Sequence, residues 1–152
     1  MTLTSSIDIA QPPDRVFAAL TDPAVLQRCI PGCEELKPIG ADAYEARVKI
    51  GVAGLKGTYS GRAELRDKRP PESLALVFDG KGGPGFVRGT ATVRLAPAGD
   101  GTHVTSNAEV QVGGLIAAVG SRLVDAAARK LAAEFFQQLA VEIGGAAEGR
   151  EV

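Results

Sequence analysis

The stretch that decides the fold is LKGTYSGRAELR, residues 55–66, in the middle of the chain. Its odd positions carry Leu, Gly, Tyr or Ala, and every even position carries a polar or charged residue. Because successive side chains of a strand point to opposite faces, this period of two predicts a β-strand with one buried and one wet face.

Other segments repeat this alternation on both sides of the central strand. Turn residues such as Pro97-Ala98-Gly99-Asp100-Gly101 separate them by hairpin-sized connections, which favour an antiparallel sheet. A first strand is predicted over 3–9, and strands resume from Glu34 onward, with clear alternation over 44–52, 74–78, 87–95 and 104–112.

Two short helices and one long helix complete the predicted fold. The short ones cover 13–20 and the segment after Asp22, a residue suited to an N-cap. After Gly113-Gly114 the apolar period changes to 3.6, which predicts one helix of about 28 residues from Leu115 to Glu142. Phe136 is expected on its far side, and the expected inner face consists of Ile116, Gly120, Leu123, Ala127, Leu131, Phe135 and Leu139.

This order of elements predicts an α+β fold of the helix-grip type. We expect a curved antiparallel sheet of about seven strands wrapped around a long C-terminal helix, with two short helices after the first strand. A chain of 152 residues leaves no room for a second core, so residues 1–143 are expected to form one domain and 144–152 a flexible C-terminal tail.

Composition excludes several kinds of function. Seventeen Lys and Arg residues against eighteen Asp and Glu give a net charge of −1, which argues against nucleic acid as a partner. A single His and two Cys residues are too few for the common metal sites, so no metal is expected. Neither a signal peptide nor a run of about 18 apolar residues is present, which predicts a soluble, cytoplasmic protein.

The inward positions of the strands carry small residues, among them Gly57, Gly61 and Gly89, and the long helix adds further Gly and Ala. Either the helix packs closely on the sheet, or the two layers enclose a cavity for an apolar ligand. We favour the cavity. Its candidate ligand-binding residues are Leu26, Tyr44, Tyr59, Phe78, Val87, Ser106, Leu123, Ala127, Leu131 and Phe135.

Three further features have a structural and a functional interpretation. Cys29 and Cys33 flank Pro31-Gly32, so we expect structural thiols in a loop near the cavity mouth, with redox chemistry or partner contact as the alternative. The glycine-rich segment 80–85 is either a hairpin turn or a mobile flap at the entrance. His103 has the polar parity of its strand and is expected in solvent.

No catalytic residue is predicted, because every carboxylate of the central strands has the outer parity and a general acid and base are therefore missing from the cavity. Tyr59 and Ser106 either orient a ligand carbonyl or bond to other polar groups nearby. The alternative function is a cavity enzyme of the polyketide cyclase or dehydratase kind, with Tyr59 or Tyr44 as the acid. An interaction module with a filled interior is a third hypothesis.

Several motifs resemble the CoxG family of carbon monoxide dehydrogenase proteins, which is part of the SRPBCC, or START-like, superfamily. The most specific is Asp22-Pro23 with Leu26, followed by Cys29-Ile30-Pro31-Gly32-Cys33-Glu34. The preceding Val16–Thr21, the scattered glycines, Gly120-Ser121-Arg122-Leu123 and Phe135-Phe136 fit as well, so the resemblance covers about residues 2–140.

The resemblance implies a helix-grip domain with an apolar pocket that serves as a non-enzymatic accessory protein. Family members are associated with molybdenum hydroxylases of the carbon monoxide dehydrogenase type, without carrying their molybdenum, iron–sulfur or flavin centres. They are linked to membrane recruitment of the dehydrogenase and to a hydrophobic, quinone-like electron acceptor. A quinone or other apolar small molecule is therefore the expected ligand, and a peripheral position at the inner membrane face is the alternative to a purely cytoplasmic one.

Overall fold

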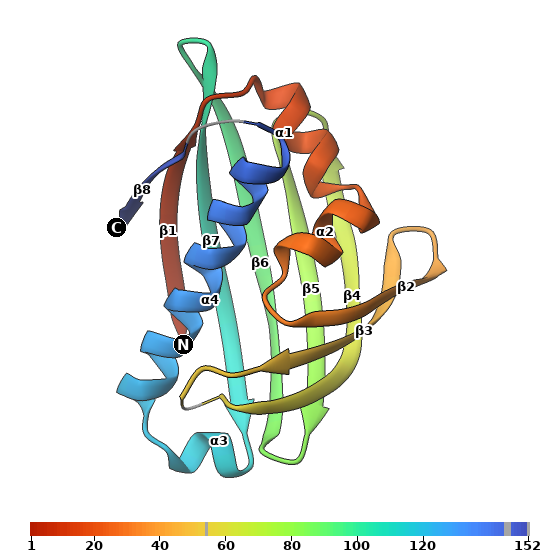
Figure 1. Ribbon diagram of the computed structural model, residues 1–152, viewed down its shortest axis with the longest axis vertical. Helices are drawn as coiled ribbons and strands as arrows, with labels where there is room; N and C mark the ends of the chain where they lie inside the picture. The colour runs from red at the N-terminus through yellow and green to blue at the C-terminus, as the bar shows by residue number, and fades with distance from the viewer. Residues whose placement is uncertain (54, 145–146, 152) are drawn as a thin grey trace.

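The computed structural model describes residues 1–53, 55–144 and 147–151. Eight strands form one antiparallel sheet in the order β2-β3-β4-β5-β6-β7-β1-β8, and the helices lie on one side of it (Figure 1). The elements are β1 Thr2–Ile9, α1 Pro13–Leu20, α2 Pro23–Cys29, β2 Cys33–Gly40, β3 Ala43–Ile50, β4 Gly57–Arg69, β5 Ser73–Gly82, β6 Gly85–Ala98, β7 Gly101–Gly113, α3 Leu115–Ala118, α4 Ser121–Glu142 and β8 Ala147–Glu151. The predicted helix-grip arrangement is confirmed.

Two glycines of the central strands are explained by close approach of neighbouring backbones. A Cβ atom at Gly61 of β4 would collide with the carbonyl oxygen of Asp79 on β5, and one at Gly89 of β6 would lie 2.5 Å from the carbonyl oxygen of Glu109 on β7. Glycine inside a strand often marks such a bend or close approach. At these positions the glycines serve the shape of the sheet, an explanation that the sequence did not suggest.

The two short helices begin where the sequence predicts. Pro13 occupies the first turn of α1, where its missing N–H costs nothing. The Asp22 carboxylate accepts a hydrogen bond of 3.0 Å from the backbone N–H of Ala24 and thereby caps α2. Both helices bury apolar side chains, including Val16 and Leu26, against the concave face of the sheet.

The predicted single helix from Leu115 to Glu142 is wrong in its continuity. Gly120 has φ +109°, a backbone conformation that a helix cannot contain, and it separates the short α3 from α4. Two face assignments are also wrong, because Leu123 is 43% exposed and Phe136 only 7% exposed. A stripe spaced by four residues drifts around the helix, so it leaves the buried face at Leu123, while β1 covers Phe136 from a second side.

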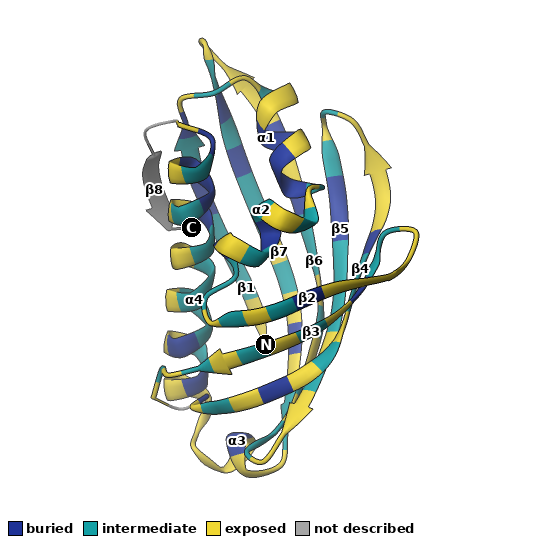
Figure 2. Ribbon diagram, turned by 45° about the vertical axis from the view of Figure 1, so that its right-hand side comes forward, coloured by how far each residue is buried: buried dark blue, intermediate teal, exposed yellow. Residues whose placement is uncertain are grey.

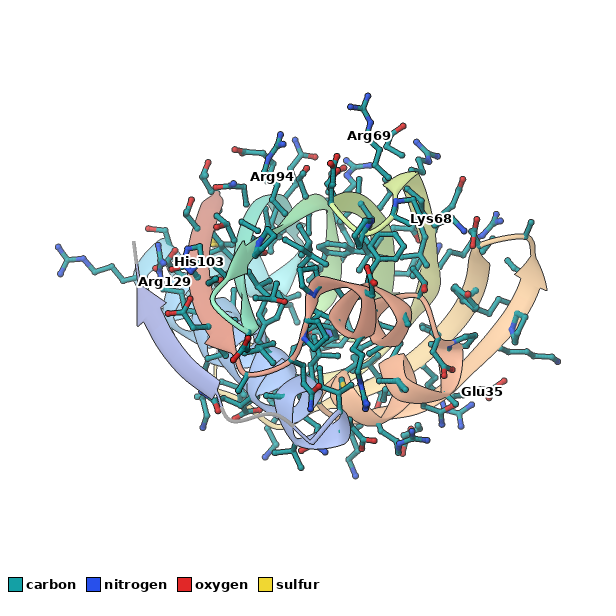
Figure 3. The ribbon with its side chains drawn as sticks, turned by 90° about the horizontal axis from the view of Figure 1, so that it is seen from above. Glu35, Lys68, Arg69, Arg94, His103 and Arg129 are labelled. Atoms are coloured by element: carbon teal, nitrogen blue, oxygen red, sulfur yellow. The ribbon has the colours of Figure 1, made fainter. Side chains whose placement is uncertain are left out.

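The core is divided into two clusters (Figure 2). The larger one, called the upper cluster, lies beneath α1 and α2 and contains Val16, Leu65, Leu95 and Leu139. The smaller, lower cluster lies at the α3 end of the molecule and consists of Leu55, Tyr59, Ile116, Val124 and Ala127. Charged side chains such as Arg69 and Arg94 project outward from the sheet (Figure 3).

The C-terminal segment differs from the expected flexible tail over 144–152. Ala147–Glu151 pairs antiparallel with β1, from Ile9 opposite Ala147 to Ser5 opposite Glu151. Its sequence AEGRE has no apolar alternation, so the position of β1 beyond β7, where a further strand can add to the sheet, accounts for this strand. Residues 145, 146 and 152 of the expected tail lie outside the described residues.

Candidate ligand-binding site

The middle of the concave face belongs to neither core cluster. Phe78 pairs in register with Gly89, and Ala91 pairs with Ala108, so these residues point to one face of the sheet. All four are only half-buried, and so is Ala63 opposite Phe78. The Phe78 ring lies over Gly89, where a Cβ atom would be 3.0 Å from Phe78 Cζ. We call this region, between the upper and lower clusters, the central hollow.

Small side chains explain why the core is interrupted there. An interior packed at the usual density would bring large side chains from the helix onto these strands. Instead Gly and Ala line the central hollow, and Phe78 is the only large side chain among the five residues named for it. The concave face therefore remains partly accessible to solvent between two well-packed ends.

The ten predicted ligand-binding residues are distributed over these regions. Leu26 and Tyr44 belong to the upper cluster, with Phe135 packed against it. Tyr59 and Ala127 belong to the lower cluster, with Val87 and Leu131 packed against it.

The other three predicted residues divide between the hollow and the surface. Phe78 and Ser106 are half-buried on the concave face between the two clusters. The inward placement of Leu123 is wrong, because this side chain lies at the surface near the start of α4. Sequence parity missed Ala63, Ala91 and Ala108 as site residues, although it had placed all three on the inner face.

The two tyrosines flank the hollow with neutral hydroxyl groups. Tyr59 Oη donates a buried hydrogen bond of 2.7 Å to the carbonyl oxygen of Leu55. Burial raises the pKa of both Tyr59 and Tyr44 above the ordinary value of a phenol, so neither ionises near neutral pH. The Tyr59 hydroxyl thus holds the segment before β4 in place and is engaged with the backbone.

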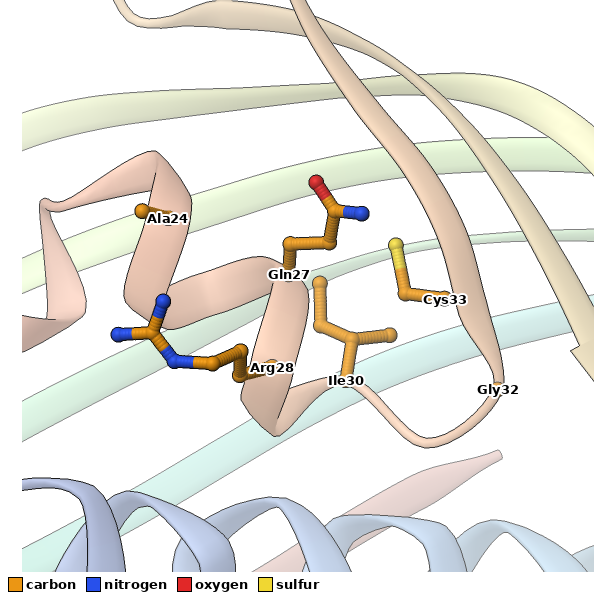
Figure 4. A pocket seen from close by; sticks show the side chains of 6 residues that line it. All are labelled: Ala24, Gln27, Arg28, Ile30, Gly32 and Cys33. Atoms are coloured by element: carbon orange, nitrogen blue, oxygen red, sulfur yellow. The ribbon is translucent and has the colours of Figure 1, made fainter.

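A separate pocket of about 520 Å³ lies beside α2 and the loop that follows it (Figure 4). Gly32 is required in this loop, because it has φ +74° and a Cβ there would collide with the carbonyl oxygen of Lys49. The Arg28 guanidinium also forms an ion pair of 2.9 Å with Glu142, which ties α2 to the end of α4. The residues lining the pocket are Ala24, Gln27, Arg28, Ile30, Gly32 and Cys33.

Sequence reasoning did not predict this pocket, and none of the ten predicted residues lines it. The Pro31-Gly32 turn signal gave its only hint. A second, smaller groove of about 270 Å³ lies between β1 and α4 and includes Ile7, Arg129 and Phe136.

The two cysteines lie at the α2 pocket as free thiols. Burial raises the pKa of Cys29 to about 11, with a further increase from the Glu142 carboxylate that Arg28 partly offsets. Burial also raises the pKa of Cys33, whose Sγ lies 3.4 Å from the carbonyl oxygen of Glu35. Thiols with raised pKa values are protonated at neutral pH and are weak nucleophiles.

Other chemistry-bearing side chains lie away from the hollow. His103 Nδ1 is 2.5 Å from Asp8 Oδ1 on the outer face of β7 and β1, where the polar parity of its strand had placed it. Among the described residues, no group of three or more His, Cys, Asp or Glu side chains is arranged to hold a metal ion. No helix in the same part of the chain is long and apolar enough to cross a membrane.

Comparison with solved structures gives close matches over nearly the whole chain. A conserved protein from Geobacillus kaustophilus is 34% identical, with a TM-score of 0.91 over 97% of this chain and 99% of that one. A protein from Chromobacterium violaceum has a TM-score of 0.71 at 19% identity, over 93% of this chain and 96% of its own. A Thermus thermophilus protein has a TM-score of 0.70 at 18% identity, over 94% of this chain and 97% of its own, and these last two show the fold alone.

Sequence comparison identifies the family. No curated protein is significantly similar to the chain. Residues 6–144, which contain the Asp22-Pro23 and Cys29–Glu34 motifs, match the carbon monoxide dehydrogenase family CoxG. With this match over most of its length, and with the fold and the two-cluster core described above, the chain belongs to the CoxG family.

Proposed function

We propose that this protein is a non-enzymatic accessory protein of a carbon monoxide dehydrogenase-type molybdenum hydroxylase. It binds a hydrophobic small molecule, quinone-like or lipid-like, in the central hollow. It then delivers this molecule as an electron acceptor, or helps to bring the dehydrogenase to the membrane. The dehydrogenase carries out the redox step, and this protein supplies the site in which the apolar molecule is held.

The observation that carries the proposal is the half-buried Phe78 between two separate core clusters. A ligand that fills the hollow would bury the remaining exposed part of this ring and the methyl groups of Ala63, Ala91 and Ala108. Burial of apolar surface stabilises the complex by ~25 cal/mol per Å² before the costs of association are subtracted. Membership of the CoxG family supports the partner class, and the neutral Tyr44 and Tyr59 hydroxyls fit an uncharged ligand.

Tyrosine fluorescence provides the test. The chain has no Trp and two Tyr residues, which belong to the two clusters that flank the hollow. A short-chain quinone analogue should therefore quench the emission in a saturable manner. Absence of saturable quenching, together with no apolar mass carried by protein from its own host in native mass spectrometry, would contradict the proposal.

A matched pair of variants locates the site. Ala91→Leu adds three carbon atoms inside the hollow, whereas Ala96→Leu makes the same change at an exposed position of the same strand. Overfilling a packed site costs ~1–3 kcal/mol, so Ala91→Leu should weaken the quinone analogue about tenfold. Ala96→Leu should bind it like the unmodified protein. Equal affinity of both variants would place the ligand elsewhere.

The enzyme alternative has its own test. In a cyclase-like mechanism Tyr59 would have to donate its proton to substrate, but its hydroxyl already donates to the Leu55 carbonyl oxygen. Tyr59→Phe and Tyr44→Phe should therefore leave quinone binding and the activity of the partner dehydrogenase unchanged. Loss of an activity in both variants would favour the enzyme.

A further inference from the structure

Three segments meet at the lower end of the molecule, where α3 lies in Figure 1. They are the described residues of the loop and strand start at 51–58, the β5–β6 hairpin at 80–89, and the end of β7 with α3 and the start of α4 at 111–124. The backbone N–H of Ile116 donates a hydrogen bond of 2.9 Å to the carbonyl oxygen of Pro84. Leu55 and Ile116 share the lower cluster, so the three segments form one surface, which we call the tip.

The tip is basic, although the whole chain is slightly acidic. It contains four basic residues, Lys56, Lys81, Arg88 and Arg122, and no Asp or Glu. The other thirteen of the seventeen basic residues share the rest of the chain with all eighteen acidic ones. No ion pair joins any of the four to another described residue.

Acidic residues just outside the tip do not neutralise it by direct pairing. Asp125 is 2.8 Å from Arg129 in an ion pair along α4. Glu109 accepts a hydrogen bond of 2.8 Å from Thr2. Asp79 pairs in register with Arg88 across β5 and β6, but no ion pair forms between these two described residues. The tip therefore presents an excess of positive charge.

The same surface exposes apolar side chains. Of the seven exposed large hydrophobic residues in the described part of the chain, four belong to the tip: Phe86, Leu115, Val119 and Leu123. Leu115 is 72% exposed. Arg88 lies over the Phe86 ring, 5.1 Å from its centroid, so charge and apolar surface are in contact. A stable fold gains nothing from this exposure.

We propose that the tip binds the surface of a bilayer that contains anionic phospholipids. Basic side chains contact the lipid phosphates, while Leu115, Val119 and Leu123 enter the boundary between headgroups and acyl chains. This combination of cations and apolar side chains fits a lipid surface better than a second copy of the chain, because two basic tips would repel each other. The inference rests on the membrane part of the proposed function and names the surface responsible.

Vesicle binding tests the charge requirement. Vesicles of phosphatidylcholine alone are compared with vesicles of phosphatidylcholine and phosphatidylglycerol, both free of quinone. The unmodified protein should sediment with the anionic vesicles only, and NaCl on the order of 0.5 M should release it because it shortens the screening length. The double variant Lys56→Glu/Arg122→Glu should bind about 25-fold more weakly, at roughly fivefold for each basic charge removed.

The matched control reverses two exposed arginines away from the tip, in Arg69→Glu/Arg94→Glu (Figure 3). It changes the net charge by the same amount and should retain vesicle binding within about threefold, since those charges lie more than a screening length from the bilayer. An equal loss in both double variants would mean that overall charge, and not the tip, governs binding. That result would overturn the inference.

A second pair of variants tests insertion of the apolar side chains. Leu115→Ser removes the most exposed large apolar residue of the tip, and Val141→Ser removes one of similar exposure near the other end of α4. Both should leave the unfolding midpoint nearly unchanged, because neither side chain is packed. Leu115→Ser should weaken binding to anionic vesicles several-fold, and Val141→Ser should not.

Other outcomes are equally decisive. If no variant and no condition gives vesicle binding while saturable uptake of the quinone analogue is intact, the inference fails and the carrier proposal stands. If vesicle binding is intact while uptake is absent, the reverse holds. If tip variants keep vesicle binding but lose co-purification with the dehydrogenase, the tip is a protein interface and the lipid inference is wrong.

Discussion

Alanine at Gly61 should destabilise the protein far more than alanine at Gly80, its direct partner across β4 and β5. A Cβ at Gly61 would collide with the carbonyl oxygen of Asp79, a backbone atom held in the sheet. A Cβ at Gly80 would meet only Tyr59 Cβ at 3.7 Å and the carbonyl oxygen of Ser60 at 3.9 Å, both ordinary van der Waals distances. The comparison therefore separates a backbone requirement for glycine from a mere preference for small residues.

The expected magnitude follows from these distances. Overpacking costs ~1–3 kcal/mol, and a clash with immovable backbone belongs at the upper end of that range. For a domain of this size each kcal/mol lowers the melting temperature by ~2–4 °C, so Gly61→Ala should melt roughly 6–12 °C below the unmodified protein. Gly80→Ala should stay within about 2 °C, because exposed or tolerated substitutions cost ~0.5 kcal/mol or less.

Thermal unfolding followed by circular dichroism measures both variants under the same conditions. Gly89→Ala provides an intermediate point, since its Cβ would lie 2.5 Å from the Glu109 carbonyl oxygen. The predicted order of melting temperatures is Gly80→Ala, then Gly89→Ala, then Gly61→Ala as the lowest. If Gly61→Ala melts no lower than Gly80→Ala, the assignment of this glycine to close strand approach is refuted.

Three further predictions concern the helices and the cysteines. Phe136→Ala should cost ~3–5 kcal/mol and Leu123→Ala under ~1 kcal/mol in urea unfolding, since only Phe136 is buried; similar costs would restore the opposite helix face. Asp22→Ala should cost about 1 kcal/mol because α2 loses its cap, whereas Asp22→Asn should cost less. Cys29 should react with a thiol reagent at pH 8 about a hundredfold more slowly than an ordinary thiol, because its pKa is raised from 9.0 to about 11. Fast labelling of folded Cys33→Ser protein would contradict that pKa.

The pKa of Cys29 also determines the sign of a pH effect on stability. Its pKa is higher in the folded protein than in the unfolded chain, so the folded state binds more protons between pH 9 and about 11. The contribution of this thiol is therefore complete below pH 9 and is lost as the pH rises through about 11. Cys29→Ala should show a smaller decrease of the urea midpoint over this range.

Strand alternation made the sheet predictable from the sequence. The period of two over 55–66 reflects a strand with one buried face, and β4 does bury Tyr59 and Leu65 while its even positions face outward. The cap at Asp22 is equally local, since its side chain bonds two residues ahead. Features that depend only on neighbours in the chain were predicted correctly.

Features that depend on distant parts of the chain were not. The break at Gly120 depends on a backbone angle that apolar spacing does not reveal. The burial of Phe136 depends on β1, and the pocket beside α2 depends on the contact between Gly32 and Lys49. β8 owes its pairing to the neighbouring β1 rather than to its own polar sequence.

The candidate site was predicted in its face but not in its residues. Parity correctly placed Tyr44, Tyr59 and Phe78 on the concave side, yet the two tyrosines became part of the packed clusters. The accessible positions are the small ones, Ala63 and Ala91, which a search for large lining residues passes over. Which side chains meet across a curved sheet is decided by the curvature, and no local pattern records it.

The most direct test of the central claim is the location of the ligand in solution. In NMR spectra of isotope-labelled protein, a short-chain quinone analogue should shift the signals of Phe78 and of the Ala63, Ala91 and Ala108 methyl groups most strongly. Signals of the α2 pocket, such as the Ala24 methyl group, should change little. If the largest shifts instead occur at Ala24 and the central hollow is unaffected, the apolar molecule binds beside α2 and the account given for the hollow is wrong.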